Sequence, residues 1–203
     1  KKYKVEKEIL LALWGIETNF GKHVGKMPII SSLATLSFDK RRSEYFSSQL
    51  IILLKLIDKK IIDHETLYGS WAGAYGNFQF MPSTIKSYAV DYDNNKKIEL
   101  KTSIRDSFAS AANYISKIGW RKGEPCFYRV KLNKEIKKKY INFSAKKISH
   151  KFNLSKWRKK GIINFDGSEI KGNYKAALIL PDGKAETPSY LVFDNYEKIL
   201  KWN

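Results

Sequence analysis

The chain has 203 residues, which is long enough to bury a substantial core in one domain or in a domain with a smaller companion. Hydrophobic residues make up 43% and aromatic residues 14% of the chain, which excludes a disordered tail. The formal net charge of +18 predicts attraction to a polyanion, whether nucleic acid, anionic lipid or a carboxylate-bearing cell wall, and does not choose among them. Cys126 is the only cysteine, so an internal disulfide is excluded, and no apolar run reaches the length of a transmembrane helix.

The first predicted element is a helix over residues 8–21 with almost no polar face, which we expect to be buried on nearly every side. In a 3.6-residue repeat, Glu17 continues a row formed by Leu10, Leu13 and Trp14. Partial burial and the negative end of the helix dipole both raise the pKa of a carboxyl group at such a position. A protonated carboxyl group is what a general acid needs, so Glu17 is the catalytic candidate; a structural Glu that caps the helix is the alternative.

A second helix is predicted from about Arg41 to Asp58, with Asp39 as its N-cap. Its expected buried stripe comprises Phe46, Leu50, Leu53, Leu54 and Ile57. Arg41 and Arg42 would lie in the first turn, where the helix dipole disfavours cations. We interpret them as groups that grip an anionic or acetamido-bearing substrate, with Tyr45 as a stacking platform; a solvated pair is the alternative.

Residues 69–81 read GSWAGAYGNFQFM, a glycine-rich and aromatic segment. It is neither a P-loop nor a dinucleotide fingerprint, because no Gly-Lys-Ser/Thr follows. We expect a tight loop in which the backbone approaches something closely, with Ser70 and Gln79 able to form hydrogen bonds. Pro82 opens the next helix, which is expected to run to about Val90.

A segment that starts at Asp91 begins like a calcium-binding loop, with Asp91, Asp93 and Asn95 at its first, third and fifth positions. Lys96 replaces the turn glycine, however, and Thr102 replaces the bidentate acid at the twelfth position. The two lysines at positions 96 and 97 also oppose a dication. We therefore expect no metal here, and these three residues are the candidate ligands if there is one.

An amphipathic helix is predicted from about Ser103 to Ile118, with a capping box of Ser103 and Asp106 and a stop at Gly119. Its expected buried face comprises Ile104, Phe108, Ala111, Ala112, Ile115 and Ile118. Past about residue 123 the pattern changes to short strands at residues 127–130, 176–180 and 189–193. The run over residues 133–147 is too basic to assign to a loop or a solvated helix.

Several kinds of catalytic site lack support in the sequence. The three histidines have no paired zinc-site spacing, no G-x-S-x-G elbow is present, and no motif surrounds Cys126. Glycoside cleavage remains, because it needs a raised-pKa acid and a groove of rings and hydrogen-bonding groups. No second carboxylate stands out, and substrate-assisted cleavage would remove the need for one.

Specific motifs follow one another in a fixed order: Trp14-Gly-Ile-Glu17-Thr-Asn-Phe-Gly21, residues 33–38, residues 41–46, residues 69–83, and Ala112-Asn-Tyr114 with Gly119-Trp120. Together they resemble the B-type membrane-bound lytic murein transglycosylases. The resemblance is very specific through residue 123. Beyond it the likeness is looser, although Asn195-Tyr196 and Trp202-Asn203 are similar to the closing motif of the family.

This resemblance implies an α+β fold. A mainly helical, lysozyme-like catalytic domain would span residues 1–122, and a small β-containing subdomain would span residues 123–197. Residues 198–203 would return towards the catalytic domain, without the terminal helix of the family.

The implied reaction is cleavage of the β-1,4 bond between N-acetylmuramic acid (MurNAc) and N-acetylglucosamine (GlcNAc) in peptidoglycan. Glu17 would act as acid and then as base on the C6 hydroxyl of MurNAc, which closes a 1,6-anhydro ring, and Ser70 would orient the acid and the substrate. The residues that the resemblance places in the substrate groove are Arg41, Arg42, Tyr45, Gln79, Phe80 and Asn203.

We expect that no cofactor is required, with calcium as the less favoured alternative. The calcium loop of the family maps onto the segment that starts at Asp91, where the departures argue against its retention. The implied partners are peptidoglycan glycan strands and not nucleic acid. We expect a monomer in the periplasm or cell envelope of a Gram-negative-type bacterium, associated with the envelope membrane through a segment before Lys1.

Three other functions stay open. A hydrolytic muramidase of the same fold would deliver water in place of the C6 hydroxyl. A catalytically silent cell-wall-binding module is the second, although the presence of Glu17 argues against it. A nucleic-acid binder is the third, and its support is charge alone.

Overall fold

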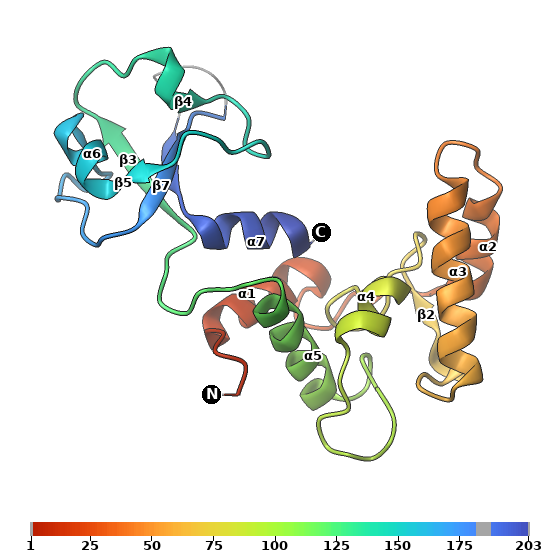
Figure 1. Ribbon diagram of the computed structural model, residues 1–203. Helices are drawn as coiled ribbons and strands as arrows, with labels where there is room; N and C mark the ends of the chain where they lie inside the picture. The colour runs from red at the N-terminus through yellow and green to blue at the C-terminus, as the bar shows by residue number, and fades with distance from the viewer. Residues whose placement is uncertain (1, 182–187, 203) are drawn as a thin grey trace. The chain divides into compact units, whose positions relative to one another are not determined.

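The computed structural model describes residues 2–181 and 188–202. The chain divides into two compact units, Lys1–Lys117 and Ile118–Asn203 (Figure 1). The first unit is mainly helical, with one short antiparallel sheet of β1 and β2. Its elements are α1 (Lys7–Thr18), β1 (Met27–Pro28), α2 (Ile29–Ser37), α3 (Ser43–Asp58), the 3-10 helix η1 (His64–Thr66), β2 (Tyr68–Gly69), α4 (Pro82–Tyr88) and α5 (Ile104–Lys117).

Helix α1 is less buried than its sequence predicts. Leu10 and Leu13 are buried, and Trp14 packs edge-on against Phe108 of α5 with 5.3 Å between ring centres. Leu11 and Ile16, however, are 43% and 80% exposed. The expectation of burial on nearly every side was wrong, because neighbouring elements of the described chain cover one side of this helix.

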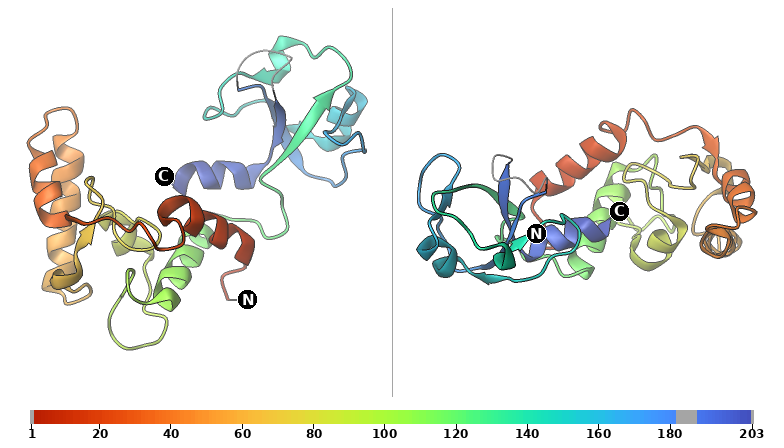
Figure 2. Two further views of the ribbon diagram at one scale, coloured as in Figure 1. Left: turned by 180° about the vertical axis from the view of Figure 1, so that it is seen from behind. Right: turned by 90° about the horizontal axis from the view of Figure 1, so that it is seen from above.

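Helix α3 begins two residues later than predicted, at Ser43, and ends at Asp58 as expected. Asp39 is not its N-cap: the carboxylate accepts hydrogen bonds from the backbone N–H of Arg41 and from its guanidinium group. The two arginines therefore precede the helix. The buried face comprises Phe46, Gln49, Leu53 and Leu56, whereas the predicted Leu54 is exposed. Helices α2 and α3 lie side by side in every view (Figure 2).

Helix α5 has a half-formed capping box. The N–H of Asp106 donates to Ser103 Oγ, as predicted, over 3.2 Å. The Asp106 carboxylate does not return to Ser103, because it accepts the backbone N–H groups of Tyr92 and Glu99 at 2.9 and 3.0 Å. Ile104 is exposed, contrary to the prediction. The helix thus fixes the loop before it through a buried carboxylate.

The second unit is built on an antiparallel sheet in the order β4-β7-β8-β3-β6, in which only the β4–β7 pair among the described strands is parallel; β5 also pairs with β7. The predicted strands at residues 127–130, 176–180 and 189–193 are confirmed as β3, β7 and β8. Its elements are β3 (Phe127–Leu132), the 3-10 helix η2 (Lys138–Tyr140), β4 (Ile141–Asn142), β5 (Phe152–Asn153), α6 (Leu154–Lys159), β6 (Ile162–Asn164), β7 (Lys175–Ile179), β8 (Ser189–Val192) and α7 (Asp194–Trp202).

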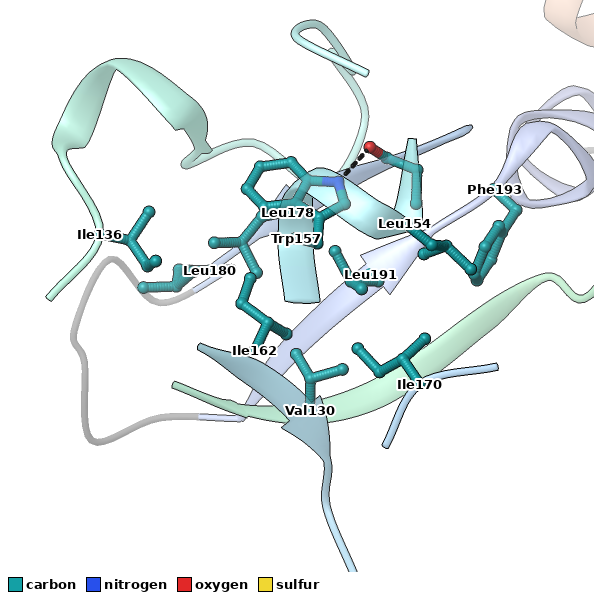
Figure 3. Packing of buried hydrophobic residues seen from close by; sticks show 11 residues of the cluster. Val130, Ile136, Leu154, Trp157, Ile162, Ile170, Leu178, Leu180, Leu191 and Phe193 are labelled. Atoms are coloured by element: carbon teal, nitrogen blue, oxygen red, sulfur yellow. Dashed lines mark hydrogen bonds between the residues drawn. The ribbon is translucent and has the colours of Figure 1, made fainter. Parts of the chain in front are cut away.

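The core of the second unit lies between this sheet and α6 (Figure 3). Trp157 of α6 is fully buried among Leu178, Leu191 and other apolar side chains, and its indole N–H donates to the carbonyl oxygen of Ala176 over 2.8 Å. Because the polar atom of the indole is satisfied, the whole ring can contribute to burial.

Helix α7 was not predicted, since residues 198–203 were expected to form a simple return. The Glu124 carboxylate accepts the N–H of Asp194, and the Asn195 side chain bonds to the backbone of Arg121 and Glu124. These bonds fix the first turn of the helix. Within residues 2–181 and 188–202, none of the helices combines the length and apolar character that spanning a bilayer requires.

Candidate active site

Glu17 lies in the last turn of α1 and is half-buried. As predicted, it continues the face that carries the buried Leu10 and Leu13 and the half-buried Trp14. The helix ends at Thr18 and is capped by Asn19, whose left-handed backbone closes the last turn through a hydrogen bond from its N–H to Gly15 O. The carboxylate therefore stands where a buried helix face meets a turn.

The end of α1 is docked onto the glycine-rich loop, residues 69–81, by hydrogen bonds from two side chains. The Thr18 hydroxyl donates to the carbonyl oxygen of Asn77 over 2.9 Å, and the Trp14 indole N–H donates to Asn77 Oδ1 over 3.0 Å. The Asn77 amide in turn donates to Leu100 O, Lys101 O and Ser107 Oγ at 3.1–3.2 Å. Asn77, only 2% exposed, thus joins α1, the glycine-rich loop and the start of α5.

Sequence reasoning missed Asn77. Its signal is an amide side chain within a run of glycines and buried rings, where a polar group must find partners for all its hydrogen-bonding atoms. A side chain of this kind is a natural anchor for a loop whose own backbone has few regular partners.

The glycine-rich loop approaches its neighbours closely, which confirms the expectation for it. Gly25 has a φ of +85°, and a Cβ atom there would lie 2.1 Å from the carbonyl oxygen of Gly69 and 2.7 Å from the nitrogen of Ser70. Met27 pairs with Gly69 in the short sheet. The segment after α1 is therefore packed directly against the backbone of Ser70.

Ser70 and Gln79 each keep one hydrogen-bonding function available among the described residues. Ser70 Oγ accepts the N–H of Ala74 over 2.9 Å, and its own hydroxyl hydrogen has no acceptor there. Gln79, which has a φ of 51°, donates its amide N–H groups to Gly76 O at 2.9 Å and Val24 O at 3.3 Å, and its Oε1 accepts no hydrogen bond there. The loop thus offers one donor and one acceptor.

The two arginines make different contacts. Arg41 pairs with Asp39, and its hydrogen bonds to that carboxylate, from the side chain first and then the backbone, lower the pKa of Asp39 to about 2. The guanidinium of Arg42 lies 4.6 Å from the ring centre of Tyr45, so it covers part of the ring that was expected to be a stacking platform.

Phe80 and Asn203 are two further residues that the sequence predicts in the substrate groove. Phe80 is 3% exposed, and its ring packs against Tyr114 at 6.0 Å. Its side chain therefore packs in the core of the first unit, and its place in the substrate groove stays a prediction. Asn203 lies outside the described residues.

Three carboxylates gather at the candidate calcium loop. Ligand oxygens of Asp91, Asp93 and Asp106 lie within 4.8 Å of one another. Asp106 was missed, because the loop was expected to end at Thr102 and this acid follows on α5. The predicted Asn95 instead donates to Glu99. These three residues offer only oxygen ligands, which suit a hard cation such as Ca²⁺. A cation held by them would offset the repulsion among the three carboxylates.

The fold and this site define a family. The chain belongs to the family described as "Transglycosylase SLT domain", which it matches over residues 1–203. This confirms the predicted resemblance and the α+β fold with a mainly helical, lysozyme-like unit.

A named protein and two solved structures are similar to this chain. The chain is 44% identical over 123 residues to membrane-bound lytic murein transglycosylase B from Escherichia coli K12. These residues make up 60% of this chain and 34% of that relative. It resembles SltB3 from Pseudomonas aeruginosa, solved in complex with NAG-anhNAM-pentapeptide, with a TM-score of 0.88, 35% identity and coverage of 99% of this chain and 53% of that chain. E. coli Slt35 in complex with calcium matches with a TM-score of 0.77, 32% identity and coverage of 99% and 62%. The chain therefore spans between about a third and two thirds of the length of these relatives.

Proposed function

We propose that this chain carries the catalytic site of a lytic transglycosylase that cleaves the β-1,4 bond between MurNAc and GlcNAc in peptidoglycan and leaves 1,6-anhydro-MurNAc ends. The observation that carries the proposal is Glu17, a half-buried carboxyl group on a helix end that hydrogen bonds fasten to the loop of Ser70 and Gln79. The similarity to SltB3, solved with a NAG-anhNAM-pentapeptide, supports the anhydro product.

The proposed reaction uses Glu17 twice. In its neutral form, Glu17 protonates the departing glycosidic oxygen. The acetamido group of MurNAc then stabilises the anomeric carbon. The Glu17 carboxylate next takes the proton of the C6 hydroxyl, whose oxygen bonds to the anomeric carbon, so that the acid is regenerated and no water is consumed.

The neighbouring residues would orient these groups. The hydroxyl hydrogen of Ser70 is available to donate to the carboxylate or the substrate, and Gln79 Oε1 is available to accept from an acetamido N–H. Arg41 and Arg42 would bind carboxylates of the substrate, with Tyr45 beside them.

We further propose the setting in which this reaction takes place. The substrate is the glycan strand of peptidoglycan, in the periplasm or at the cell envelope, and the chain acts as a monomer without nucleic acid. The E. coli relative is named as membrane-bound, which supports association with the envelope membrane.

The test is digestion of purified sacculi followed by mass spectrometry of the products. We expect anhydro ends, which are lighter than reducing ends by one water. Glu17→Gln should lower the rate by about 10²–10⁴-fold, since it removes the proton donor. Glu8→Gln is the matched control, because Glu8 is an exposed carboxylate on the same helix. Reducing ends would identify a hydrolytic muramidase, and an undiminished rate for Glu17→Gln would refute the assigned acid.

We also propose that the reaction requires no cofactor, because acid and base chemistry by one carboxyl group completes it. The rate should be the same in EDTA as in added Ca²⁺. A loss in EDTA that Ca²⁺ alone restores would contradict this, and would assign a structural ion to Asp91, Asp93 and Asp106.

A further inference from the structure

Positive charge is concentrated in the second unit. It holds 20 of the 38 Lys and Arg residues of the chain but only 8 of the 20 Asp and Glu residues. Its net charge is thus +12, against +6 for the first unit. Lysines spread evenly over a surface indicate no particular binding site, whereas lysines that the fold brings together form a candidate one.

Three lysines converge on one aromatic ring in this unit. The ammonium groups of Lys139, Lys156 and Lys160 lie 5.4, 5.3 and 4.0 Å from the ring centre of Tyr140. Lys156 also lies 3.5 Å from the ring centre of Phe152. We call these five residues the lysine–aromatic cluster. They come from η2 and from the continuous run of β5, α6 and the residue after α6, and the fold brings these two parts of the chain together.

The two rings of the cluster are held in place by packing against each other and against the core of the second unit. Tyr140 and Phe152 meet edge-on at 5.5 Å, and Phe152 meets the buried Trp157 edge-on at 5.4 Å. Both outer rings pack against the core of the second unit. The ammonium groups therefore rest on a rigid base, and cation–π attraction partly offsets the repulsion among them.

Acidic side chains do not offset that repulsion. In residues 118–181 and 188–202, Arg121, Lys151 and Arg158 form ion pairs with carboxylates, whereas none of the cluster lysines takes part in one. Each ammonium group lies within 5.4 Å of one ring centre, so no two are more than about 11 Å apart, which is close to the screening length of roughly 8–10 Å in physiological salt. Three like charges at this spacing attract a polyanion strongly.

We propose that the lysine–aromatic cluster is a second contact surface for peptidoglycan, which binds carboxylates of the stem peptides and keeps the enzyme on the wall between cleavage events. The inference rests on the proposed function, because the wall is the polyanion that a lytic transglycosylase meets. The ammonium groups cover the ring faces, so charge and not sugar stacking carries the contact. Because carboxylates repeat along a strand, a contact that breaks is quickly replaced by another, so that many weak contacts give a high overall affinity.

The test compares two triple variants of equal charge, both made in a Glu17→Gln background so that the wall is not digested. One is Lys139→Gln, Lys156→Gln and Lys160→Gln. The control is Lys122→Gln, Lys147→Gln and Lys171→Gln, whose exposed side chains have neither ion pairs nor ring contacts among the described residues. Thermal unfolding of each variant checks that it folds.

Co-sedimentation with purified sacculi at low and physiological salt gives the measurement. We expect the cluster variant to bind about tenfold more weakly than the parent, with a smaller salt dependence, and the control to bind within about twofold of the parent. Sacculi whose carboxylates have been amidated should bind the parent and the cluster variant equally. When the same three lysine substitutions are made with Glu17 intact, the cleavage rate on short soluble glycans should equal that of the parent.

Equal losses in the two triple variants would overturn the inference, because general charge would then explain binding. It would also be overturned if the cluster variant lost binding to phosphatidylglycerol vesicles or to duplex DNA but kept its affinity for sacculi. Neither result concerns the cleavage chemistry, whereas failure of the unaltered chain to form anhydro ends would overturn the proposed function itself.

Discussion

The interiors of the two units differ mainly in how much regular strand pairing they contain. The second unit surrounds Trp157 with apolar side chains, and its paired strands supply backbone partners to one another. In the first unit, buried polar side chains such as Asn77 and Asp106 bind the backbones of irregular loops. Loops have no ladder of backbone partners, so they need such anchors. The loop that bears Ser70 and Gln79 is one of them, so under the proposed function its anchor would contribute to activity as well as to stability.

The change expected to have the largest effect tests the apolar half of this comparison. Trp157→Ala should lower the free energy of unfolding by about 3–5 kcal/mol, because it leaves a cavity and removes the hydrogen bond to Ala176. Chemical denaturation gives the free energy, and hydrogen exchange of the β7 amides locates the loss. Phe143→Ala is the control, since that ring is exposed in the same unit. A loss below about 1 kcal/mol would contradict the central place given to Trp157.

The second prediction separates a structural anchor from a functional one. Asn77→Ala should cost about 1–3 kcal/mol, because buried carbonyl groups and the Trp14 indole lose their partner. Asn142→Ala in the second unit is a matched control, because that buried amide donates to Ser149 O and Leu178 O. At a temperature where both variants are folded, only Asn77→Ala should lower the rate of glycan cleavage.

Equal cleavage rates for these two asparagine variants, each compared with the parent, would break the comparison. The docking of the glycine-rich loop onto α1 would then contribute to stability alone, and the orientation of Ser70 and Gln79 would have to depend on other contacts.

The third prediction concerns an ion-pair cluster at the start of α7, where Lys151 contacts Asp194 at 2.6 Å and also Glu197. The hydrogen bond from Lys151 lowers the pKa of Asp194, burial opposes this, and the charges of Lys151, Arg121 and Lys198 lower it further. The folded pKa is thus below the unfolded value of about 3.9, so this stabilisation is present above about pH 4 and is lost as the pH falls through the folded pKa.

Lys151→Gln should therefore lower the free energy of unfolding at pH 7 by about 1–2 kcal/mol, and this difference from the parent should shrink below about pH 4. Urea denaturation from pH 7 to pH 3 provides the measurement. Lys175→Gln, an exposed lysine of β7 without an ion pair among the described residues, should show little effect at either pH. A Lys151→Gln effect of equal size at pH 3 and pH 7 would mean that the pairing with Asp194 is not its source.

Strong local patterns made much of the fold predictable from the sequence. The apolar row that leads to Glu17 predicts α1, and the runs of β-branched and aromatic residues predict β3, β7 and β8. Helix α6 was missed, because six residues with two buried positions, Leu154 and Trp157, are too few to show a helical period. Helix α7 was missed because its first turn depends on the distant Glu124 carboxylate.

The candidate site was predictable to the extent that it lies in motifs. Glu17, Ser70 and Gln79 stand in such motifs, and hydrogen bonds join the helix end of the first to the loop of the others. Asn77 and Asp106 were not predicted as anchors, since their roles depend on backbone groups that only the folded chain brings near. Asp39 shows the opposite error: a capping residue by sequence, it binds the adjacent arginine instead.

The smallest effect on stability is expected for two substitutions, each of which removes an exposed cation from one of the two units. Arg41 is exposed and pairs with Asp39 in solvent, and Lys137 is an exposed lysine before η2. Exposed ion pairs contribute little to folding, so Arg41→Ala and Lys137→Ala should both leave the unfolding midpoint nearly unchanged. Any difference between their kinetics therefore reports substrate contact.

We expect Arg41→Ala to raise KM for glycan strands by about three- to tenfold and Lys137→Ala to leave it unchanged, because a guanidinium group binds carboxylates in two-point contacts. Steady-state cleavage assays measure the two constants, and equal KM values would remove Arg41 from the groove and leave the first unit with Glu17, Ser70 and Gln79 as its candidate site.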